Sequence, residues 1–280
     1  MREIEAVRIA EEIKRLCIES NYYLAGDIKG GLKDALKKEN SDLARDILEK
    51  ILENAEIAKA EQVPMCQDTG MACVFVEIGQ EVHIVGGSLK EAINEGVRKG
   101  YEEGYLRKSV VRDPLRRVNT GDNTPAVINY EIVEGDRLKI ILAPKGFGSE
   151  NMSQIKMLKP SEGINGVKEF VLKAVKEAGS NPCPPIVVGI GLGGTFDKSA
   201  LLAKKALIRP INLRNKDKFY SELEEELLKG INSIGIGPQG FGGKTTALAV
   251  NIEAYPTHIA GLPVAVNINC HATRHAEVEL

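Results

Sequence analysis

The sequence has no tryptophan, few other aromatic residues and no excess of either charge. Its 37 Lys and Arg residues are balanced by 39 Asp and Glu residues, so it lacks the basic field that nucleic-acid binding requires. No apolar run approaches the roughly 20 residues that cross a bilayer. The N-terminal segment Met1-Arg2-Glu3-Ile4-Glu5 has charges where a signal peptide has its apolar core. These absences predict a cytoplasmic protein that binds neither nucleic acid nor membranes.

The five cysteines also lack the close pairing that is typical of a zinc ribbon. In the cytoplasm their thiols are expected to stay reduced. A hydrophobic content of 43% and a charged content of 27% are ordinary for a globular protein. The 280 residues therefore suffice for one large domain or for two modest lobes.

The spacing of apolar residues predicts helices throughout residues 1–60. In the first helix the apolar residues share one face, which includes Cys17, and we expect that thiol to be buried. A second helix follows Asp27, and a third begins near Ser41, a candidate N-cap. The predicted apolar stripe of the third helix consists of Leu43, Ile47, Ile51 and Leu52.

Strands alternate with helices in residues 61–280. We expect residues 82–85 to pair with the strand at 72–78, in which Cys73 is buried, and residues 134–136 to form a turn between two strands. The remaining strands are predicted at 126–132, 138–142, 185–190, 247–252 and 264–268, and the helices at 88–105, 163–178, from 197, and at 216–231. This pattern predicts an α/β (mixed α+β) fold, with a helical N-terminal region and two α/β lobes that meet at the cysteine loops. We interpret residues 1–280 as a single domain.

Two glycine-rich segments resemble nucleotide-binding loops but depart from their patterns. The glycine spacing in residues 189–194 does not match the dinucleotide fingerprint, so we favour close backbone packing there. Residues 240–246 have Pro238 five positions before the Gly-Lys pair, where a phosphate loop requires glycine. The second segment could still present backbone N–H groups to an anion. A nucleotide-dependent enzyme is therefore a weaker alternative.

Three cysteines lie in segments rich in proline, glycine and polar residues. They are Cys66 in Pro64-Met65-Cys66-Gln67-Asp68-Thr69-Gly70, Cys183 in Asn181-Pro182-Cys183-Pro184-Pro185, and Cys270 in Asn267-Ile268-Asn269-Cys270-His271. A [4Fe–4S] cluster normally takes four thiolates, so three would leave one iron open to a substrate. Two further polar loops, at 119–125 and 145–151, follow or join predicted strands, where ligand-binding loops commonly lie. Each loop alone could be an ordinary turn.

At these motifs the chain resembles the α subunit of the two-subunit class I fumarate hydratases and the similar L(+)-tartrate dehydratases. The resemblance runs from about Pro64 to Leu280. Besides the cysteine motifs it includes Val118-Asn119-Thr120-Gly121, Lys145-Gly146-Phe147-Gly148-Ser149-Glu150-Asn151 and Gly237-Pro238-Gln239-Gly240-Phe241-Gly242-Gly243. It implies a lyase with a [4Fe–4S] cluster: a hydro-lyase in which Cys66, Cys183 and Cys270 ligate three irons. The fourth iron would bind the substrate and act as a Lewis acid.

The resemblance also implies roles for residues around the cluster. Gln67 and Asp68 match a substrate-side pair, in which Asp68 transfers a proton or orients a group, although it could instead cap the Thr69-Gly70 turn. Arg107 matches an arginine that binds a substrate carboxylate, Gly148 a glycine whose backbone approaches the substrate, and His258 a histidine near the cavity. No secure counterpart exists for Lys244, His271, Arg274 and His275.

In single-chain members of that family, a second domain after the third cysteine supplies a threonine base. Here the sequence ends ten residues after Cys270, so we expect a separate β subunit and a hetero-oligomer. The expected reaction is the reversible hydration of fumarate, a small dicarboxylate, to L-malate. Dehydration of L(+)-tartrate to oxaloacetate is the nearest alternative. A non-catalytic iron–sulfur protein that senses redox state is an alternative of another class.

Overall fold

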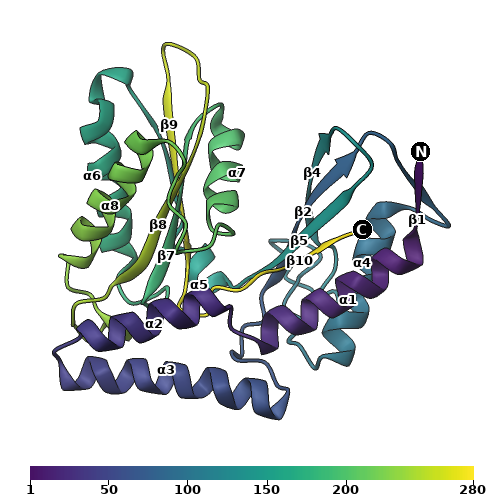
Figure 1. The fold of residues 1–280 in the computed structure, drawn as a ribbon, viewed down its shortest axis with the longest axis horizontal. Helices are drawn as coiled ribbons and strands as arrows, with labels where there is room; N and C mark the ends of the chain where they lie inside the picture. The colour runs from purple at the N-terminus through teal and green to yellow at the C-terminus, as the bar shows by residue number, and fades with distance from the viewer. The chain divides into compact units, whose positions relative to one another are not determined.

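The computed structural model describes residues 1–280, and the chain divides into two compact units (Figure 1). Unit 1 consists of Met1–Leu24, Ala55–Phe147 and Arg274–Leu280. Unit 2 consists of Ala25–Asn54 and Gly148–Thr273. Both units combine helices with mixed sheets, so the predicted α/β fold class is confirmed. No helix combines the length and the apolar character that spanning a membrane requires.

Unit 1 is built on a four-stranded sheet with the order β10-β5-β2-β4. The inner strand β2 pairs antiparallel with β5 and parallel with β4. A separate two-stranded parallel sheet joins β1 and β3. The strands of unit 1 are β1 (Arg2–Glu5), β2 (Met71–Gly79), β3 (Val82–Val85), β4 (Val127–Val133), β5 (Leu138–Lys145) and β10 (Ala276–Glu279).

Helices α1 (Ala6–Tyr22) and α4 (Leu89–Glu103) share the hydrophobic core of the unit 1 sheet. As their periodicity predicts, both helices direct one apolar face inward, and Ile9 and Ile93 are fully buried. Cys17 belongs to the same core, where burial raises the pKa of its thiol. The burial predicted for Cys17 and Cys73 is confirmed.

The predicted pairing of residues 82–85 with the strand at 72–78 is wrong. Strand β3 instead pairs with β1, because both edges of β2 are already occupied by β5 and β4. The turn at 134–136 does connect β4 and β5, but each of these strands pairs with β2 and not with the other. These partners are far apart in sequence, so local patterning does not reveal them.

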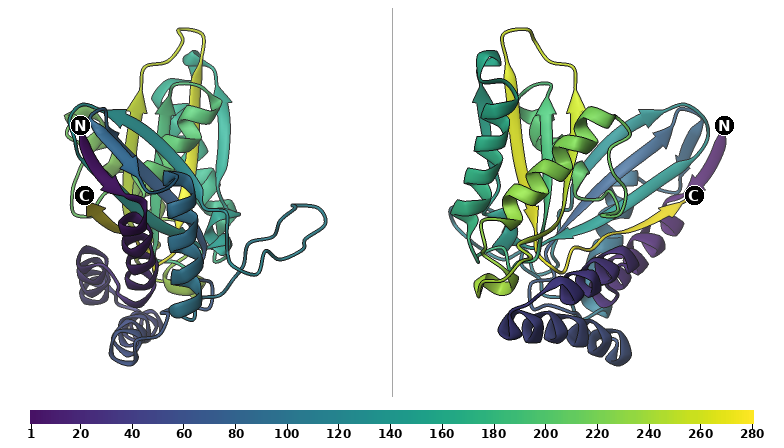
Figure 2. Two further views of the ribbon diagram at one scale, coloured as in Figure 1. Left: turned by 90° about the vertical axis from the view of Figure 1, so that its right-hand side faces the viewer. Right: turned by 60° about the vertical axis from the view of Figure 1, so that its left-hand side comes forward.

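Residues 106–126, between α4 and β4, form a long loop that extends away from the sheet of unit 1 (Figure 2). A short bridge between Val111 and Asn119 joins its two sides, and Leu115 near the tip is 90% exposed. At the base of the loop Asp122 accepts hydrogen bonds from Thr124 and Arg98. Burial would raise the pKa of Asp122, but these hydrogen bonds lower it to about 2. The base of the loop is therefore fixed to α4.

Unit 2 contains a four-stranded sheet with the order β6-β9-β7-β8. Strand β7 is buried along its whole length, as its continuous apolar run predicts. Helices α6 and α8 cover one face of the sheet and α7 covers the other (Figure 1). The strands are β6 (Gln154–Leu158), β7 (Ile186–Gly193), β8 (Ala247–Tyr255) and β9 (Leu262–Asn269); the helices are α2 (Gly26–Lys38), α6 (Gly163–Ala178), α7 (Phe196–Ala206) and α8 (Lys218–Asn232).

The glycines of residues 189–194 allow β7 and α7 to pack closely. A Cβ atom on Gly191 would lie 1.9 Å from the carbonyl oxygen of Ser199, and one on Gly189 would lie 2.2 Å from that of Ala203. Both carbonyls belong to α7. The packing interpretation of this motif is therefore confirmed.

Helix α3 (Asp42–Glu61) begins after Ser41, whose hydroxyl oxygen accepts a hydrogen bond from the N–H of Ala44, as predicted for an N-cap. Its predicted apolar stripe is partly wrong, because Leu43 is 52% exposed. The buried residues are instead Ala44, Leu48, Ala55 and Ala58. Small alanines carry this face, and a search for large apolar residues overlooks them.

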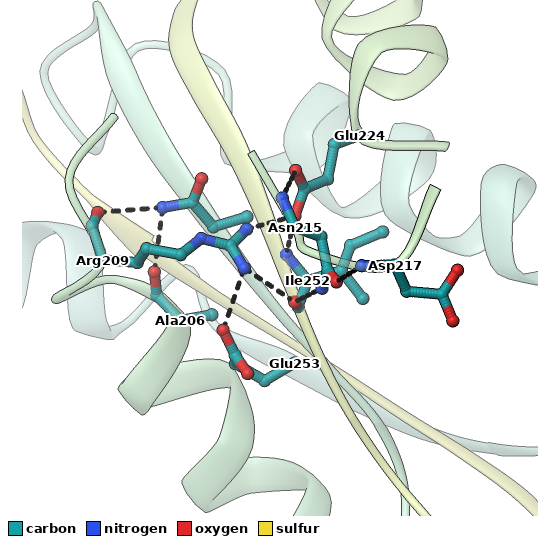
Figure 3. Close-up of polar contacts among 8 residues, drawn as sticks. Ala206, Arg209, Asn215, Asp217, Glu224, Ile252 and Glu253 are labelled. Carbon is teal, nitrogen blue, oxygen red and sulfur yellow. Dashed lines mark hydrogen bonds and ion pairs between the residues drawn. The ribbon is translucent and has the colours of Figure 1, made fainter. Parts of the chain in front are cut away.

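A buried charged network fixes the segment between α7 and α8 in unit 2 (Figure 3). Glu224 is fully buried and pairs with Arg209, which also pairs with Glu253 at 3.0 Å. The Glu224 carboxylate accepts further hydrogen bonds from the backbone N–H groups of Asn215 and Ile252. Because its charge is compensated and its oxygens are bonded, Glu224 can remain buried beside β8.

Candidate active site

Cys66 opens a short turn in unit 1 that runs from residue 66 to residue 70, between α3 and β2. Its thiol is partly exposed and lies 3.4 Å from the side-chain oxygen of Gln67. A pocket of about 280 Å³ opens beside it. The pocket is lined by Pro64, Cys66, Gln67, Thr69, Tyr105 and Arg107. The structure thus brings together three of the predicted residues of unit 1: Cys66, Gln67 and Arg107.

Asp68 is fixed by backbone hydrogen bonds. One carboxylate oxygen accepts from the N–H of Gly70 at 3.0 Å, and the other accepts from the N–H of Phe147 at 2.8 Å. The first bond is the turn cap that the sequence allowed as an alternative. The second ties the Cys66 turn to the residues that follow β5. A role of Asp68 in proton transfer stays a prediction.

Buried side chains hold the carbonyl groups of the same turn. The Tyr101 hydroxyl lies 2.9 Å from the carbonyl oxygens of both Thr69 and Gly70, and Asn123 donates to the Gly70 carbonyl at 3.2 Å. Burial raises the pKa of Tyr101 well above its ordinary value, so its phenol stays protonated and can donate. Tyr101 carries no signal of this role in the sequence, and Asn123 is predicted there only as part of a polar loop.

Arg274 is a further buried contact of the Cys66 turn, although the sequence assigns it no role. The residue is 5% exposed, and Nη2 donates to the carbonyl oxygen of Asp68. The other terminal nitrogen, Nη1, is buried without a hydrogen-bond partner. Burial of a guanidinium N–H without an acceptor costs free energy, so Nη1 sets Arg274 apart from the other residues that contact the turn.

In unit 2, Cys183 and Cys270 lie at the same end of the sheet. Cys183 precedes β7 and Cys270 follows β9, and these strands are antiparallel, with Val187 opposite Asn269. The N–H of His271 donates to the Cys183 carbonyl at 3.2 Å, and its ring Nδ1 lies 3.0 Å from the same oxygen. The structure therefore brings the two predicted cysteine loops of this unit together.

The loop around Gln239 supports the Cys183 loop from a third segment. The backbone N–H and the side-chain amide of Gln239 both donate to the Pro184 carbonyl at 2.8 Å, and the amide lies 3.1 Å from His271 Nδ1. Cys183 and Gln239 both adopt positive φ values, of 53° and 52°. Non-glycine residues rarely adopt this conformation, and when they do they are often at functional sites.

Gly148 and His258, also in unit 2, have different locations. A Cβ atom on Gly148 would lie 3.6 Å from the carbonyl oxygen of Asn181, which is two positions before Cys183 in the sequence. His258 lies in the exposed loop between β8 and β9, where its Nδ1 accepts from the N–H of Ala260 at 3.2 Å. The eight residues of β9, about 26 Å at 3.3 Å per residue, separate this loop from Cys270. Within unit 2, His258 is not near the two cysteines.

Neither unit alone contains a group of three or more His, Cys, Asp or Glu side chains that could hold a metal ion. Cys66 belongs to unit 1, whereas Cys183 and Cys270 belong to unit 2. None of the five cysteines forms a disulfide.

A backbone N–H of the glycine-rich segment at 240–246 binds a carboxylate from within unit 2. The N–H of Lys244 donates to a carboxylate oxygen of the buried residue Glu39 at 2.7 Å. Although burial raises the pKa of Glu39, hydrogen bonds from the backbone of Lys244, Ser41 and Asn40 lower it overall. The acceptor for this N–H is therefore a side chain of the same unit.

Comparison with known proteins identifies the family. The family model described as fumarate hydratase (Fumerase) matches residues 10–279. The chain belongs to this family of hydro-lyases. The match includes all three loop cysteines, most of unit 1 and the whole of unit 2, and it confirms the resemblance seen in the sequence.

Curated relatives match the chain over most of their length. A protein of Methanocaldococcus jannaschii named "Putative L(+)-tartrate dehydratase subunit alpha" is 50% identical over 277 residues, which cover 96% of each chain. The L(+)-tartrate dehydratase subunit alpha of Escherichia coli K12 is 32% identical over 252 residues, 89% of this chain and 82% of the relative. That of Escherichia coli UTI89 is 33% identical over 258 residues, 91% and 84% of the two chains.

Proposed function

We propose that this hydro-lyase chain is the α subunit of an iron–sulfur enzyme that interconverts fumarate and L-malate. The observation that carries the proposal is the pocket of unit 1, where a cysteine thiol, an amide and a guanidinium group lie together. These groups belong to Cys66, Gln67 and Arg107. Such a pocket offers a metal-binding thiol and a carboxylate-binding cation to one small dicarboxylate.

The residues of the chain fit a [4Fe–4S] cluster in their chemistry. The three loop thiols are at least partly exposed, whereas Cys17 and Cys73 are buried in hydrophobic surroundings. The buried Nη1 of Arg274 also suits an anionic group near the Cys66 turn. The proposal assigns the three thiolates to Cys66, Cys183 and Cys270. When bound, the cluster would supply an iron with an open coordination position that acts as a Lewis acid.

The side chains of unit 1 have distinct tasks in the proposed reaction. Arg107 binds a substrate carboxylate through its two parallel N–H groups, and Gln67 donates from its amide. Asp68 keeps a fixed orientation because each of its oxygens accepts a backbone N–H. Hydration adds a hydroxyl to one carbon and a proton to its neighbour, so positioning by these groups decides which face of the double bond reacts.

A β subunit completes the proposed enzyme. The relatives in Methanocaldococcus jannaschii and Escherichia coli are each named as subunit alpha, which supports a partner for this chain as well. In single-chain members of the family that the sequence resembles, a second domain supplies a threonine base. We therefore propose that the α subunit alone turns over little substrate and that the complex is the active form.

L(+)-tartrate dehydration is a second candidate, because the names of the relatives favour it. Steady-state kinetics on the chain purified anaerobically with its β partner decide between the substrates. The proposal expects a larger kcat/KM for fumarate and L-malate than for L(+)-tartrate, and the reverse order would favour the tartrate reaction. Iron-loaded complex that turns over neither substrate would instead favour a redox sensor.

A pair of arginine variants tests the pocket itself. Arg107→Met should lower kcat/KM on the order of 30-fold to 100-fold, the equivalent of one charged hydrogen bond or two. Arg112→Met is the matched control, because Arg112 is an exposed residue of the same loop and does not line the pocket. Equal losses in the two variants would contradict the assignment of Arg107.

A further inference from the structure

Arg274 stands apart from the other arginines of unit 1 because its guanidinium group is buried. Arg112, Arg116 and Arg117 are exposed, whereas Arg274 is only 5% exposed. It precedes β10, which pairs with β5, so the unit 1 sheet fixes the backbone next to it. A buried cation needs acceptors, and the acceptor that Arg274 has, the Asp68 carbonyl, belongs to the Cys66 turn.

The contacts of Arg274 are divided between its two terminal nitrogens. Nη2 donates to the Asp68 carbonyl, in the middle of the turn that begins at Cys66. Nη1 is buried and has no hydrogen-bond partner. Folding therefore leaves one charged donor beside the turn without an acceptor, a cost that an incoming anionic group would remove.

We propose that Arg274 is a positioning residue that holds the Cys66 turn through Nη2 and offers Nη1 to the anionic group that the turn binds. This inference deepens the proposed function, and its second half rests on it. The first half concerns the order of the turn in the cluster-free chain. It can therefore be tested whether or not the enzyme assignment is right.

Thiol labelling measures the order of the turn directly. The full-length chain, freed of iron by a chelator, is treated with iodoacetamide, and the labelling rate of each cysteine is followed by peptide mass spectrometry. Arg274→Met should raise the rate at Cys66 about tenfold, because the turn loses one charged hydrogen bond. Cys183, in unit 2, should keep its rate. Arg274→Lys retains a cationic donor but not the planar guanidinium group. Its labelling rate at Cys66 should therefore lie between those of the wild type and Arg274→Met.

The other cysteines and a second arginine serve as controls. Cys17 and Cys73 are buried, so they report general loosening of unit 1. Arg137→Ala removes an exposed pair with Glu279 on β10 and should leave Cys66 labelling unchanged. A Cys66 rate in Arg274→Met within twofold of the wild type would overturn the proposal. So would a parallel rise at Cys73, because Arg274 would then stabilise the whole unit and not the turn.

Iron content tests the role of Nη1. Reconstituted with iron and sulfide, the Arg274→Met chain should retain less iron than the wild type at equal concentration, and Arg274→Lys should recover part of the difference. Equal retention in Arg274→Met and the wild type would overturn the role of Nη1. A wild type that takes up no iron would contradict the proposed function, and with it the role of Nη1, while the labelling result would still decide the role of Nη2.

Discussion

In unit 1 the Cys66 turn is held by side chains from distant parts of the sequence, whereas in unit 2 the Cys183 loop is held largely by backbone geometry. Tyr101, Asn123 and Arg274 all donate to carbonyl groups of the turn. The Cys183 loop instead depends on prolines, on positive φ values and on backbone contacts from neighbouring segments. The two regions should therefore be destabilised by opposite kinds of substitution. Unit 1 should be sensitive to the loss of side-chain atoms and unit 2 to their addition.

The largest effect should come from an exception in unit 2, the buried pair of Glu224 and Arg209 (Figure 3). Glu224→Ala should lower the free energy of unfolding by about 3–4 kcal/mol, because it leaves Arg209 only partly compensated and two backbone N–H groups without acceptors. Glu253→Ala, which removes a partly exposed partner, should cost about 1 kcal/mol or less. Urea titration of both variants measures the difference. Equal costs would show that burial of Glu224 does not set the energy.

In unit 2, added side-chain atoms should disturb the loops around Cys183. Gly237 has a φ of 68°, and a Cβ atom there would lie 1.8 Å from the Gly242 carbonyl. Gly237→Ala should therefore cost about 3 kcal/mol and distort the loop that carries Gln239. Gly235 has a φ of 77° but open space around it, so Gly235→Ala should cost only about 1 kcal/mol. If the two variants unfold at the same urea concentration, steric contact does not shape this loop.

In unit 1, the loss of side-chain atoms should disturb the Cys66 turn. Asn123 is fully buried, accepts from the N–H groups of Ser109 and Val110, and donates to the Gly70 carbonyl. Asn123→Ala should cost about 2 kcal/mol, because two backbone N–H groups lose their acceptor and the Gly70 carbonyl keeps only the Tyr101 hydroxyl. Asn119→Ala in the same loop removes two exposed hydrogen bonds and should cost less than about 0.5 kcal/mol. Denaturation midpoints measure both, and a costly Asn119→Ala would contradict the comparison.

The smallest effect, and one that depends on pH, is expected at Tyr101. Tyr101→Phe should cost about 1 kcal/mol at pH 7, since the turn loses its phenol donor. Burial raises the pKa of Tyr101 in the folded state. Above a pH of about 10 the tyrosine ionises only in the unfolded state. The free energy of unfolding of the wild type should therefore fall by up to about 1.4 kcal/mol per pH unit, whereas that of the phenylalanine variant should not fall for this reason. Urea titrations at pH 7 and pH 10.5 should show the gap closing; a constant gap would contradict a buried, neutral phenol.

Much of the fold could be predicted because many elements have strong local patterns. Residues 163–178 were predicted as a helix and form α6 with the same bounds, and the buried run after Pro185 forms β7. The short strands β1, β6 and β10 were missed, because a strand of only four or five residues carries little periodic signal. The pairing of β3 was wrong because strand order depends on partners distant in sequence.

For the candidate site, too, some residues could be predicted from local sequence and others could not. Cysteines in proline- and glycine-rich loops are visible locally, and the structure gives the loop thiols more exposure than the buried Cys17 and Cys73. The residues that hold the loops are not visible locally, because Arg274 contacts Asp68 from 206 positions away and Tyr101 lies 32 positions from Thr69. His258 was expected near the cavity, yet it lies at the far end of β9 from Cys270. Its role stays a prediction.

We propose that the loop thiols of this chain hold an iron–sulfur cluster for hydro-lyase chemistry. Anaerobic analysis of iron and acid-labile sulfide, on the chain purified with its β partner, is the decisive experiment. We expect about four irons and about four sulfides per chain. A preparation that contains zinc in place of iron, or that takes up no iron and sulfide after anaerobic reconstitution, would contradict it.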